Sequence, residues 1–396
     1  MTNITLLGST GSIGTSTLDV VRRHPEQFRV FALVAGRNTA LLCSQILEFR
    51  PRVAIVADQE TVKAVSDGLR SSGFPQKEWP ELAAGAQARV QASVAPEVAF
   101  VMSAIVGVAG LPATYEAIRA KKRIGLANKE VLVASGQLVM AAAQEFGVDL
   151  LPVDSEHNGA HQCFRAGRRE EVKRLLLTAS GGPFRETPIH QLWDVTPEQA
   201  LNHPTWKMGR RITIDSASMM NKGFEVIEAC WLFHLPPSQV DVVVHPQSSI
   251  HAMVEYNDGS IIAQVSATDM RMPIQYALTY PRRELAPVPR LDWTQPRSWQ
   301  FFAPDLEKFR LLKLAYEAQT QGGSATCTLN AADEIAVEAF LEGRIPFPAI
   351  AQVVEDTLAR QISCQPATIE EVIAVDESSR TTARQVVAES RWAATA

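Results

Sequence analysis

The sequence predicts an α/β protein with an N-terminal parallel sheet, a central α+β domain and a C-terminal α-helical bundle. Through residues 1–150, short apolar runs alternate with helical patterns, which is typical of βαβ units. After about Ala160, strand and hairpin patterns replace that alternation. Beyond a proline-rich stretch, the apolar patterns have helical periodicity. These changes of pattern predict the order of the three regions.

The N-terminal region is predicted to alternate strands and helices. Strands are expected at Ile4–Leu7, Val30–Val34, Val53–Val56, Val98–Met102, Ile124–Ala127 and Leu150–Val153. Helices are expected at Ser16–Arg23, Thr39–Phe49, Thr61–Leu69, Thr114–Lys121 and Glu130–Phe146. The piece from Ser71 to Gln91 is irregular and holds its own Pro and Gly residues, so we expect a loop and a short helix there.

The central region is predicted to form an antiparallel sheet with inserted loops and helices. Strands are expected at Arg174–Thr178 and Val240–Val244. The strands Ile250–Tyr256 and Ser260–Val265 are joined by Asn257-Asp258-Gly259, a hairpin signal because Gly tolerates positive φ. This pattern indicates a second domain.

The C-terminal region follows a linker rich in proline, from Pro281 to Pro296. Helices are expected at Leu306–Gln319, Ala331–Leu341, Ala349–Gln361 and Thr381–Trp392. We therefore expect a sheet domain at 1–150, a central domain at 151–285, a linker at 286–305 and a helical domain at 306–396.

Composition favours an ordinary globular protein of a reducing compartment. The net charge of −5 gives no reason to expect nucleic-acid or membrane-surface binding. The 5 cysteines are scattered and lack C-x-x-C spacing, so we expect reduced thiols and no zinc site. The N-terminus lacks a secretion signal and no apolar run would span a bilayer, so the cytoplasm is the expected location.

A glycine-rich loop, Gly8 to Gly14, joins the first strand to the first helix. In a Rossmann-like sheet this loop and the helix N-terminus hold a pyrophosphate, although a tight turn without a ligand would also need glycine. The second strand ends at Arg37 and Asn38, where an NAD site usually has an acid. A guanidinium and an amide suit a 2′-phosphate, which favours NADP(H). The alternative is that Arg37 is a solvated surface base.

Polar residues also follow the strand expected at Ile124–Ala127. Lys129 could meet a substrate hydroxyl or phosphate there, and Asn128 and Glu130 could meet the nicotinamide ribose. The same tripeptide is also an ordinary helix start.

Two acids, Asp154 and Glu156, directly follow the apolar run Val148–Val153. In an extended strand end, residues two apart point to the same side, so their carboxylates can converge. Oxygen ligands suit Mg²⁺ or Mn²⁺. The alternative is a solvated turn at the end of a strand.

A set of donors for a phosphate follows in the central region. Ser180 lies in a Ser-Gly-Gly turn after a strand, where the backbone can approach an anion closely. The Asp/Ser cluster from Asp215 to Ser218 is interpreted as an N-cap, with a helix after it. The donors expected to bind the phosphate are Ser180, Ser216, Asn221 and Lys222.

The same helix offers a third carboxylate for a metal. Glu225 is four residues from Asn221 and three from Lys222, so the three side chains share one face. Glu228 lies one turn on, and spacing alone leaves it as a competitor for the role of Glu225. A solvent-facing helix with one Lys–Glu pair is the remaining alternative.

A polar segment, Asn202 to Arg210, precedes that helix and carries Trp206 and Met208. An aromatic side chain closing over a polar site would exclude water, so this segment is a candidate lid. The alternative is a Trp packed into the domain surface, with His203 as its polar neighbour.

In these segments the chain resembles the 1-deoxy-D-xylulose 5-phosphate reductoisomerases of the non-mevalonate isoprenoid route (MEP pathway). The resemblance covers Gly8–Gly14, Ala35–Asn38, Leu126–Glu130, Pro152–Asn158, Thr178–Arg185, His203–Glu228, His245–Tyr256 and Ala267–Pro273. The departures are slight, namely Arg37 where a Lys is also seen and Thr205 within the lid. The resemblance implies a cytoplasmic homodimer in which the central domain catalyses and dimerises.

The resemblance also implies roles for single residues. It assigns Asp154, Glu156 and Glu225 to Mg²⁺ or Mn²⁺, and Ser180, Ser216, Asn221 and Lys222 to the phosphate of a sugar phosphate. It places Lys129, Ser155, Glu156 and His203 near the substrate's hydroxyl end, with Lys129, Glu156 and His203 as catalytic residues. It assigns Thr10, Gly11, Ser12, Ile13, Gly36, Arg37, Asn38, Asn128, Glu130 and Gly209 to NADPH, and Trp206 and Met208 to the lid.

Two other functions remain open at this point. A metal-dependent oxidative decarboxylase of a hydroxy acid would share the cofactor and the cation, but it needs donors for a free carboxylate, typically Arg. A non-catalytic NADP(H)-sensing module would predict loss of the acidic trio, whereas Asp154, Glu156 and Glu225 are all present.

Overall fold

The structure is a computed structural model that describes residues 1–206 and 208–389. These residues form two compact units that are interleaved along the chain. The first unit contains Met1–Val131, Val139–Asn158 and Asp269–Pro289. The second contains Leu132–Leu138, Gly159–Thr268 and the chain from Arg290 onward. Each unit is described by itself.

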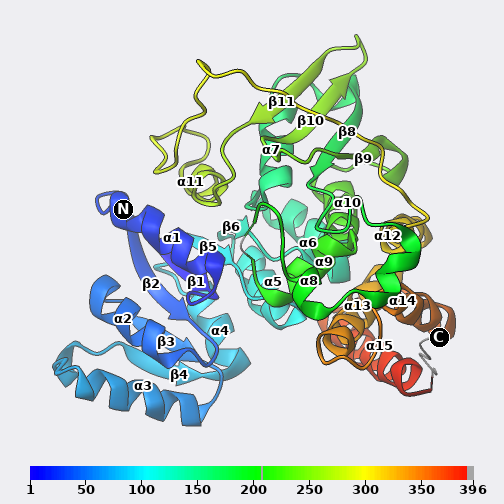
Figure 1. The fold of residues 1–396 in the computed structure, drawn as a ribbon. Coiled ribbons are helices and arrows are strands. Elements are labelled where there is room, and N and C mark those ends of the chain that lie inside the picture. Colours follow the sequence, from blue (N-terminus) through cyan, green and yellow to red (C-terminus); the bar gives the residue numbers. More distant parts are fainter. Residues whose placement is uncertain (207, 390–396) are drawn as a thin grey trace. The chain divides into compact units, whose positions relative to one another are not determined.

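A seven-stranded parallel sheet forms the centre of the first unit, in the order β4-β3-β2-β1-β5-β6-β7 (Figure 1). Its strands are β1 (Thr2–Leu7), β2 (Phe28–Val34), β3 (Val53–Val56), β4 (Glu81–Ala84), β5 (Phe100–Ser103), β6 (Arg123–Leu126) and β7 (Leu150–Pro152). The strand order reverses between β1 and β5, and open α/β sheets bind ligands at the carboxyl ends of the strands beside such a point. The α/β fold predicted from the sequence is confirmed.

Helices connect the strands of this sheet. The connecting helices are α1 (Ser12–Arg23), α2 (Thr39–Phe49), α3 (Gln59–Ser71), α4 (Gly85–Val94), α5 (Leu111–Arg119) and α6 (Glu130–Phe146), whose stretch Leu132–Leu138 belongs to the second unit. The start of α7 (Ser155–Phe164) follows the last strand, and α11 (Arg271–Thr279) joins this unit from later in the chain. Buried side chains of α1, α2, α3 and α11 form one apolar cluster with the strands, including Leu18, Leu42, Val65 and Ile274. Arg271 of α11 also forms an ion pair with Asp19 of α1, at 2.9 Å.

Two elements of this unit differ from the expectation. The piece Ser71–Gln91 contains the edge strand β4, which pairs in parallel with β3. Its sequence, Glu-Leu-Ala-Ala, lacks β-branched residues, so only the pairing identifies it as a strand. The chain after β7 forms α7 instead of an extended strand end, which moves Glu156 into the first turn of a helix.

The second unit contains a mixed sheet in the order β11-β10-β8-β9. Its strands are β8 (Val172–Ala179), β9 (Val240–Val244), β10 (Ile250–Tyr256) and β11 (Ile261–Val265). The hairpin predicted between β10 and β11 is confirmed. The prediction of a fully antiparallel sheet is wrong, because β8 and β9 pair in parallel. Several helices separate these two strands in sequence, which supplies the crossover that a parallel pair requires.

Helices make up the rest of the second unit. They are α8 (Pro197–Ala200), α9 (Arg210–Ala217), α10 (Met220–Leu232), α12 (Arg310–Gln321), α13 (Ala325–Leu341), α14 (Ala349–Arg360) and α15 (Ile369–Glu389). The last four confirm the expected C-terminal helical region, and the end of the helix expected at Thr381–Trp392 lies outside the described residues. The Asp/Ser cluster is not an N-cap: Asp215 and Ser216 lie inside α9, and Met219, at φ 63°, reverses the chain into α10.

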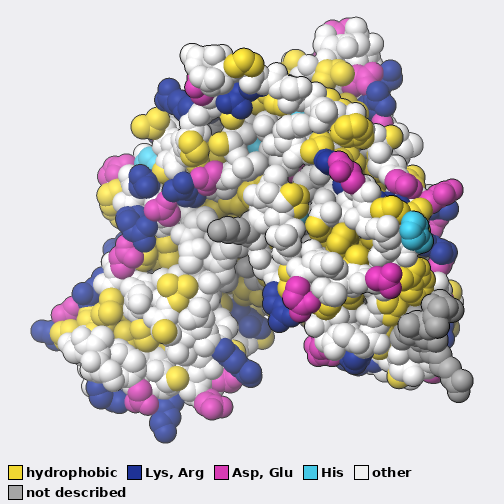
Figure 2. Space-filling model, in the orientation of Figure 1, with side chains coloured by type: hydrophobic (Ala, Val, Ile, Leu, Met, Phe, Trp, Pro, Cys, Tyr) yellow, Lys and Arg dark blue, Asp and Glu magenta, His cyan; other side chains and the backbone are white. Residues whose placement is uncertain are grey.

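Basic and acidic side chains are interspersed on the face drawn in Figure 2. No helix in the described residues is both long and apolar enough to cross a bilayer. The cysteines, all within the described ranges, are free thiols.

Candidate functional site

The glycine-rich loop occupies the turn between β1 and α1. Gly8 has a φ of 92°, and a Cβ on it would lie 2.4 Å from the carbonyl oxygen of Ala104. A Cβ on Gly14 would lie 2.3 Å from the carbonyl oxygen of Gly8. The N–H groups of Ser12 and Ile13 are in the first turn of α1, where a helix has no acceptors of its own for them. The loop therefore presents backbone donors at a helix N-terminus beside the reversal of strand order.

The loop between β2 and α2 carries the residues expected to select the cofactor. The Arg37 side chain is 83% exposed, and its Nη2 lies 3.5 Å from Oδ2 of Asp58. Asn38 caps α2, because its Oδ1 accepts a hydrogen bond from the N–H of Leu41 at 3.2 Å. Its amide N–H₂ remains a potential donor, and Gly36 borders open space.

Asn128 and Glu130 hold a neighbouring loop that the sequence analysis missed. The amide of Asn128 donates hydrogen bonds to the carbonyl oxygens of Ile105 and Gly107. Oε1 of Glu130 accepts from the N–H of Gly107 at 3.2 Å. This loop leaves the carboxyl end of β5, next to β1, and exposes Val106. Gly107, at φ 74°, was the only local signal for it.

The first two acids of the expected metal set lie where β7 leads into α7. Oδ1 of Asp154 accepts the N–H of Glu156 at 3.2 Å, so Asp154 caps the helix. Oδ2 of Asp154 lies 3.0 Å from Nζ of Lys129, which is buried. Ser155 Oγ donates to Oε2 of Glu156 at 2.5 Å. Carboxylate oxygens of Asp154 and Glu156 lie within 4.8 Å of each other, and a helix start brings this about rather than a strand end.

Contacts to Asn158 and His157 fix the start of α7. Asn158 is fully buried and donates to the carbonyl oxygens of Pro152 and Pro273, at 2.8 and 3.3 Å. His157 is also buried, with Nδ1 3.5 Å from Oδ1 of Asp154. The backbone that carries the acids is thereby tied to β7 and α11.

In the second unit, His203 bridges the two serines that the sequence assigns to the phosphate. Its Nε2 lies 3.1 Å from Oγ of Ser180 and 3.0 Å from Oγ of Ser216. Its Nδ1 accepts the N–H groups of Thr205 and Trp206 at 3.1 and 2.9 Å. A ring that accepts at Nδ1 is neutral and carries its proton on Nε2. Burial lowers the pKa of His203, in agreement with that neutral form.

Two glycines let the turn after β8 approach α9. Gly181 and Gly182 have φ values of 84° and 65°, and a Cβ on Gly182 would lie 2.7 Å from the carbonyl oxygen of Ser216. The N–H of Gly182 donates to Oγ of Ser180 at 3.2 Å. A larger residue here would push the two serines apart.

The polar side chains of α10 form a buried group. Oε1 of Glu225 accepts from the amide of Asn221 at 2.6 Å, and Oε2 forms an ion pair with Nζ of Lys222. Lys222 and Glu225 are 4% and 1% exposed. The alternative interpretation of a solvent-facing helix with one Lys–Glu pair is therefore wrong. Glu228 is equally buried, and burial therefore does not decide between the two glutamates.

The candidate lid is the irregular stretch between α8 and α9. Trp206 and Met208 are half-buried, and Gly209 is exposed directly before α9. Lys207 between them lies outside the described residues.

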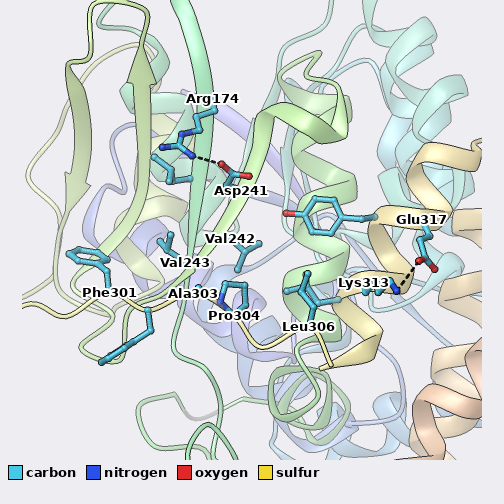
Figure 3. Close-up of a pocket in the computed structure, with 14 residues that line it drawn as sticks. Arg174, Asp241, Val242, Val243, Phe301, Ala303, Pro304, Leu306, Lys313 and Glu317 are labelled. Carbon is cyan, nitrogen blue, oxygen red and sulfur yellow. Dashed lines mark hydrogen bonds and ion pairs between the residues drawn. The ribbon is translucent and has the colours of Figure 1, made fainter. Parts of the chain in front are cut away.

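The second unit also contains an open groove of about 790 Å³, whose lining includes none of the candidate site residues (Figure 3). That groove has a largely apolar lining, which includes Val242, Phe301, Pro304 and Leu306. Its charged members are paired, since Arg174 binds Asp241 at 2.8 Å and Lys313 lies 3.8 Å from Glu317. It therefore lacks the polar donors that a sugar phosphate requires.

Comparisons with known proteins identify the family. Three domain families of 1-deoxy-D-xylulose 5-phosphate reductoisomerase match: the enzyme's own family at residues 4–136, and C-terminal domain families at 150–233 and 265–382. The chain belongs to the 1-deoxy-D-xylulose 5-phosphate reductoisomerase family. The resemblance seen in the motifs is thus confirmed over nearly the whole chain.

Individual reductoisomerases match at full length. The protein of that name from Solibacter usitatus is 64% identical over 386 residues, covering 98% of this chain and 97% of the relative. The one from Dechloromonas aromatica is 50% identical over 396 residues, covering 99% and 98%. The solved structure from Zymomonas mobilis in complex with NADPH has a TM-score of 0.90 at 44% identity, covering 98% and 100%. A reductoisomerase with NADPH, fosmidomycin and magnesium has a TM-score of 0.91 at 39% identity, covering 98% of each chain.

The residues present fit both groups that the reductoisomerase family uses. A side chain at Gly8 or Gly14 would fill the cradle between β1 and α1, and the free helix N–H groups there suit a pyrophosphate. Asp154, Glu156 and Glu225 offer only carboxylate oxygens, the ligand type of Mg²⁺ and Mn²⁺. These residues were predicted from the sequence, but the hydrogen bonds of His203 with Ser180 and Ser216 were not.

Proposed function

We propose that this protein is an NADPH- and divalent-metal-dependent enzyme that converts 1-deoxy-D-xylulose 5-phosphate into 2-C-methyl-D-erythritol 4-phosphate, for isoprenoid precursor synthesis. The observation that carries the proposal is the full-length match to named reductoisomerases at identities up to 64%. The match includes a structure with NADPH, fosmidomycin and magnesium.

The N-terminal unit would bind NADPH. The loop from Thr10 to Ile13 would hold the pyrophosphate by its backbone N–H groups, while Gly36, Arg37 and Asn38 would surround the 2′-phosphate. Asn128 and Glu130 would form the nicotinamide end through the loop that they support. Bound NADPH supplies the hydride that reduces the rearranged aldehyde.

Asp154, Glu156 and Glu225 would hold the divalent cation through their carboxylate oxygens. A divalent cation held by these acids would supply positive charge to polarise the ketone of the substrate and to stabilise the negative charge that develops as a carbon–carbon bond breaks. Lys129, whose Nζ donates to Asp154, would orient a substrate hydroxyl beside that carboxylate. Ser155 would assist from the start of α7.

Hydrogen-bond donors of the second unit would bind the phosphate. Ser180 and Ser216 lie on either side of His203, and Lys222 and Asn221 add a charge and an amide on α10. We assign His203 to this phosphate end rather than to the hydroxyl end, because its Nε2–H is directed at the two serine hydroxyls. Trp206 and Met208 would cover the reaction and keep the fragments from escaping before the new bond forms, and Gly209 would contact NADPH.

We further propose a homodimer in the cytoplasm. The edge strand β11 exposes Ile261 and Ile262 at 53% and 39%, a poor surface for an isolated edge but a suitable one for a second copy. The five free thiols are compatible with a reducing compartment. Sedimentation of the purified protein tests the dimer directly.

The activity is tested by mixing the purified protein with NADPH, Mg²⁺ or Mn²⁺ and 1-deoxy-D-xylulose 5-phosphate. NADPH absorbance should fall only when the sugar phosphate and the cation are both present, and EDTA should stop the reaction. NADH in place of NADPH is the matched cofactor control. Absence of any NADPH consumption with either cation would contradict the proposal.

A further inference from the structure

A buried group of charged side chains connects α9 to the C-terminal helices. Arg211 on α9 reaches α13 through three contacts: Nη1 lies 2.8 Å from Oε1 of Glu334, and Nη2 lies 3.0 Å from Oδ1 of Asn330 and 3.6 Å from Oδ2 of Asp333. Nε of Arg211 lies 3.6 Å from Oδ2 of Asp215, one turn further along α9. None of these contacts was indicated by the sequence.

Within this group two carboxyl groups, those of Asp215 and Asp333, approach the same guanidinium in a buried environment. Asp333 is fully buried and Asp215 is 4% exposed. Burial raises the pKa of Asp333 well above its usual range, and the negative charge of Asp215 raises it further, against the opposing effect of Arg211. Two buried carboxylates that both approach one guanidinium, each at 3.6 Å, cannot both ionise cheaply.

The remaining charges around the pair are already matched. Oε2 of Glu334 forms an ion pair with Arg380 of α15 at 2.7 Å, and Arg380 binds Asp376 at 2.6 Å. From α10 the ring of Phe224 lies under the guanidinium of Arg211, 5.9 Å from its centre. Arg211 is therefore divided among several acceptors and cannot neutralise a second full charge at Asp333.

The consequence for the site comes from the position of Asp215 in the chain. The next residue, Ser216, is the serine whose Oγ lies 3.0 Å from Nε2 of His203. Helix α9 is only 8 residues long and its N-cap, Gly209, makes no side-chain cap. A helix of this length has little stability of its own, so its packing against α10 and α13 decides where Ser216 lies.

We propose that Asp215 and Asp333 share one proton, and that the pair, together with Arg211, positions α9 so that Ser216 can bind the phosphate of the substrate. Asp333, Asp215 and Arg211 are positioning residues, because they act through Ser216. The inference rests on the proposed role of Ser216. It gives the C-terminal helices a function in substrate binding.

Loss of the shared proton should weaken substrate binding more than catalysis. An ionised Asp333 would repel Asp215 and push α9 away from α13, and the serine would move with the helix. The KM for the sugar phosphate should therefore rise at alkaline pH, while kcat and the KM for NADPH change less.

The test uses steady-state kinetics of the full-length enzyme across neutral and alkaline pH. Asp333→Asn copies the protonated acid in shape, so its KM at neutral pH should stay within about twofold of the wild type and should not rise at alkaline pH. Arg211→Met should raise the KM for the sugar phosphate roughly 10-fold, with Arg211→Lys recovering part of the loss. Glu338→Gln, an exposed acid on the same helix, is the matched control and should keep the wild-type profile.

Two results would overturn the inference. One is an alkaline rise of KM in Asp333→Asn equal to that of the wild type. The other is a KM for the sugar phosphate that is 10-fold or more higher in Asp333→Asn than in the wild type at neutral pH. That result would mean that the ionised form of Asp333 is required. Difference infrared spectra give a readout independent of turnover: the band of a protonated carboxylic acid should be present in the wild type and absent from Asp333→Asn.

Ser216→Ala separates this inference from the assignment of Ser216. A raised KM for the sugar phosphate in that variant supports the phosphate role, and an unchanged KM overturns both that role and the positioning of the serine. The shared proton is then still decided by the infrared band. If the wild-type enzyme consumed no NADPH, the proposed reductoisomerase activity itself would be contradicted.

Discussion

The loops of the first unit that are expected to bind the cofactor and helix α10 of the second unit hold polar side chains in opposite surroundings. Arg37, expected to bind the 2′-phosphate, is 83% exposed. Lys222 and Glu225 on α10 are 4% and 1% exposed. Water satisfies the first kind of group until the ligand arrives, whereas groups of the second kind must satisfy one another.

This difference predicts how each region responds to mutation. Removing an exposed cofactor contact removes that contact alone. Removing one member of a buried set leaves its partner without compensation, which costs more than the lost bond itself. Substitutions in the buried set should therefore cause the larger losses.

Glu225→Gln should cause the largest loss. The amide removes a ligand charge from the metal set and leaves Lys222 without its partner on α10. A loss of several kcal/mol of transition-state stabilisation corresponds to a fall in kcat/KM of about 10³-fold or more. Turnover with Mn²⁺ and calorimetric Mn²⁺ binding should both decline.

Glu228→Gln is the matched comparison, because Glu228 is just as buried and lies on the same helix. If this variant lost Mn²⁺ binding while Glu225→Gln kept it, the helix carboxylate would have been assigned incorrectly. If both bound Mn²⁺ normally, α10 would contribute no ligand.

Arg37→Met should have an intermediate and selective effect. Hydrogen bonds to a charged group contribute about 1.5–3 kcal/mol, so the KM for NADPH should rise roughly 10- to 100-fold. The KM for NADH and the melting temperature should hardly change, since the only ion pair of Arg37 in the described residues is an exposed one with Asp58. Arg29→Met, an exposed base on β2, is the control. Equal effects on NADPH and NADH would argue against a 2′-phosphate contact.

The same contrast explains what the sequence could predict. The loops at Gly8–Gly14 and Ala35–Asn38 are local: their position after a strand and before a helix is visible in the pattern, and the structure confirms that position. Strand β4 was missed because its four residues carry little β propensity and depend on pairing with β3.

Buried polar groups were harder to predict because their partners are distant in sequence. Spacing correctly brought Asn221 and Lys222 to Glu225 on one helix. No local pattern could join His203 to Ser180, or Arg211 to Asn330, 119 residues away. The acids Asp154 and Glu156 were found for the wrong geometric reason, since a helix cap brings them together rather than strand alternation.

The side chain of His203 is half-buried, between the exposed Arg37 and the buried Glu225. Its protonation should have the smallest effect of the three, a loss of unfolding free energy at acidic pH. Its lowered pKa, caused by burial, keeps the ring neutral in the folded protein, and the unfolded chain binds the proton more readily. Stability is therefore present above the ordinary pKa of 6.5 and is lost as the pH falls through it toward the lower folded value. Protonation would also place a proton on Nδ1 against the N–H groups of Thr205 and Trp206.

The expected loss of unfolding free energy is less than about 1 kcal/mol, because water screens the half-exposed ring. Denaturant titrations between neutral and mildly acidic pH should show it in the wild type and in His190→Gln, an exposed control, and should show a flatter profile in His203→Asn. Asparagine keeps an acceptor near the position of Nδ1 but does not titrate in this range. An unchanged slope in His203→Asn would mean that the ring is not held neutral by the turn, and the tautomer that directs Nε2–H at the serines would lose its support.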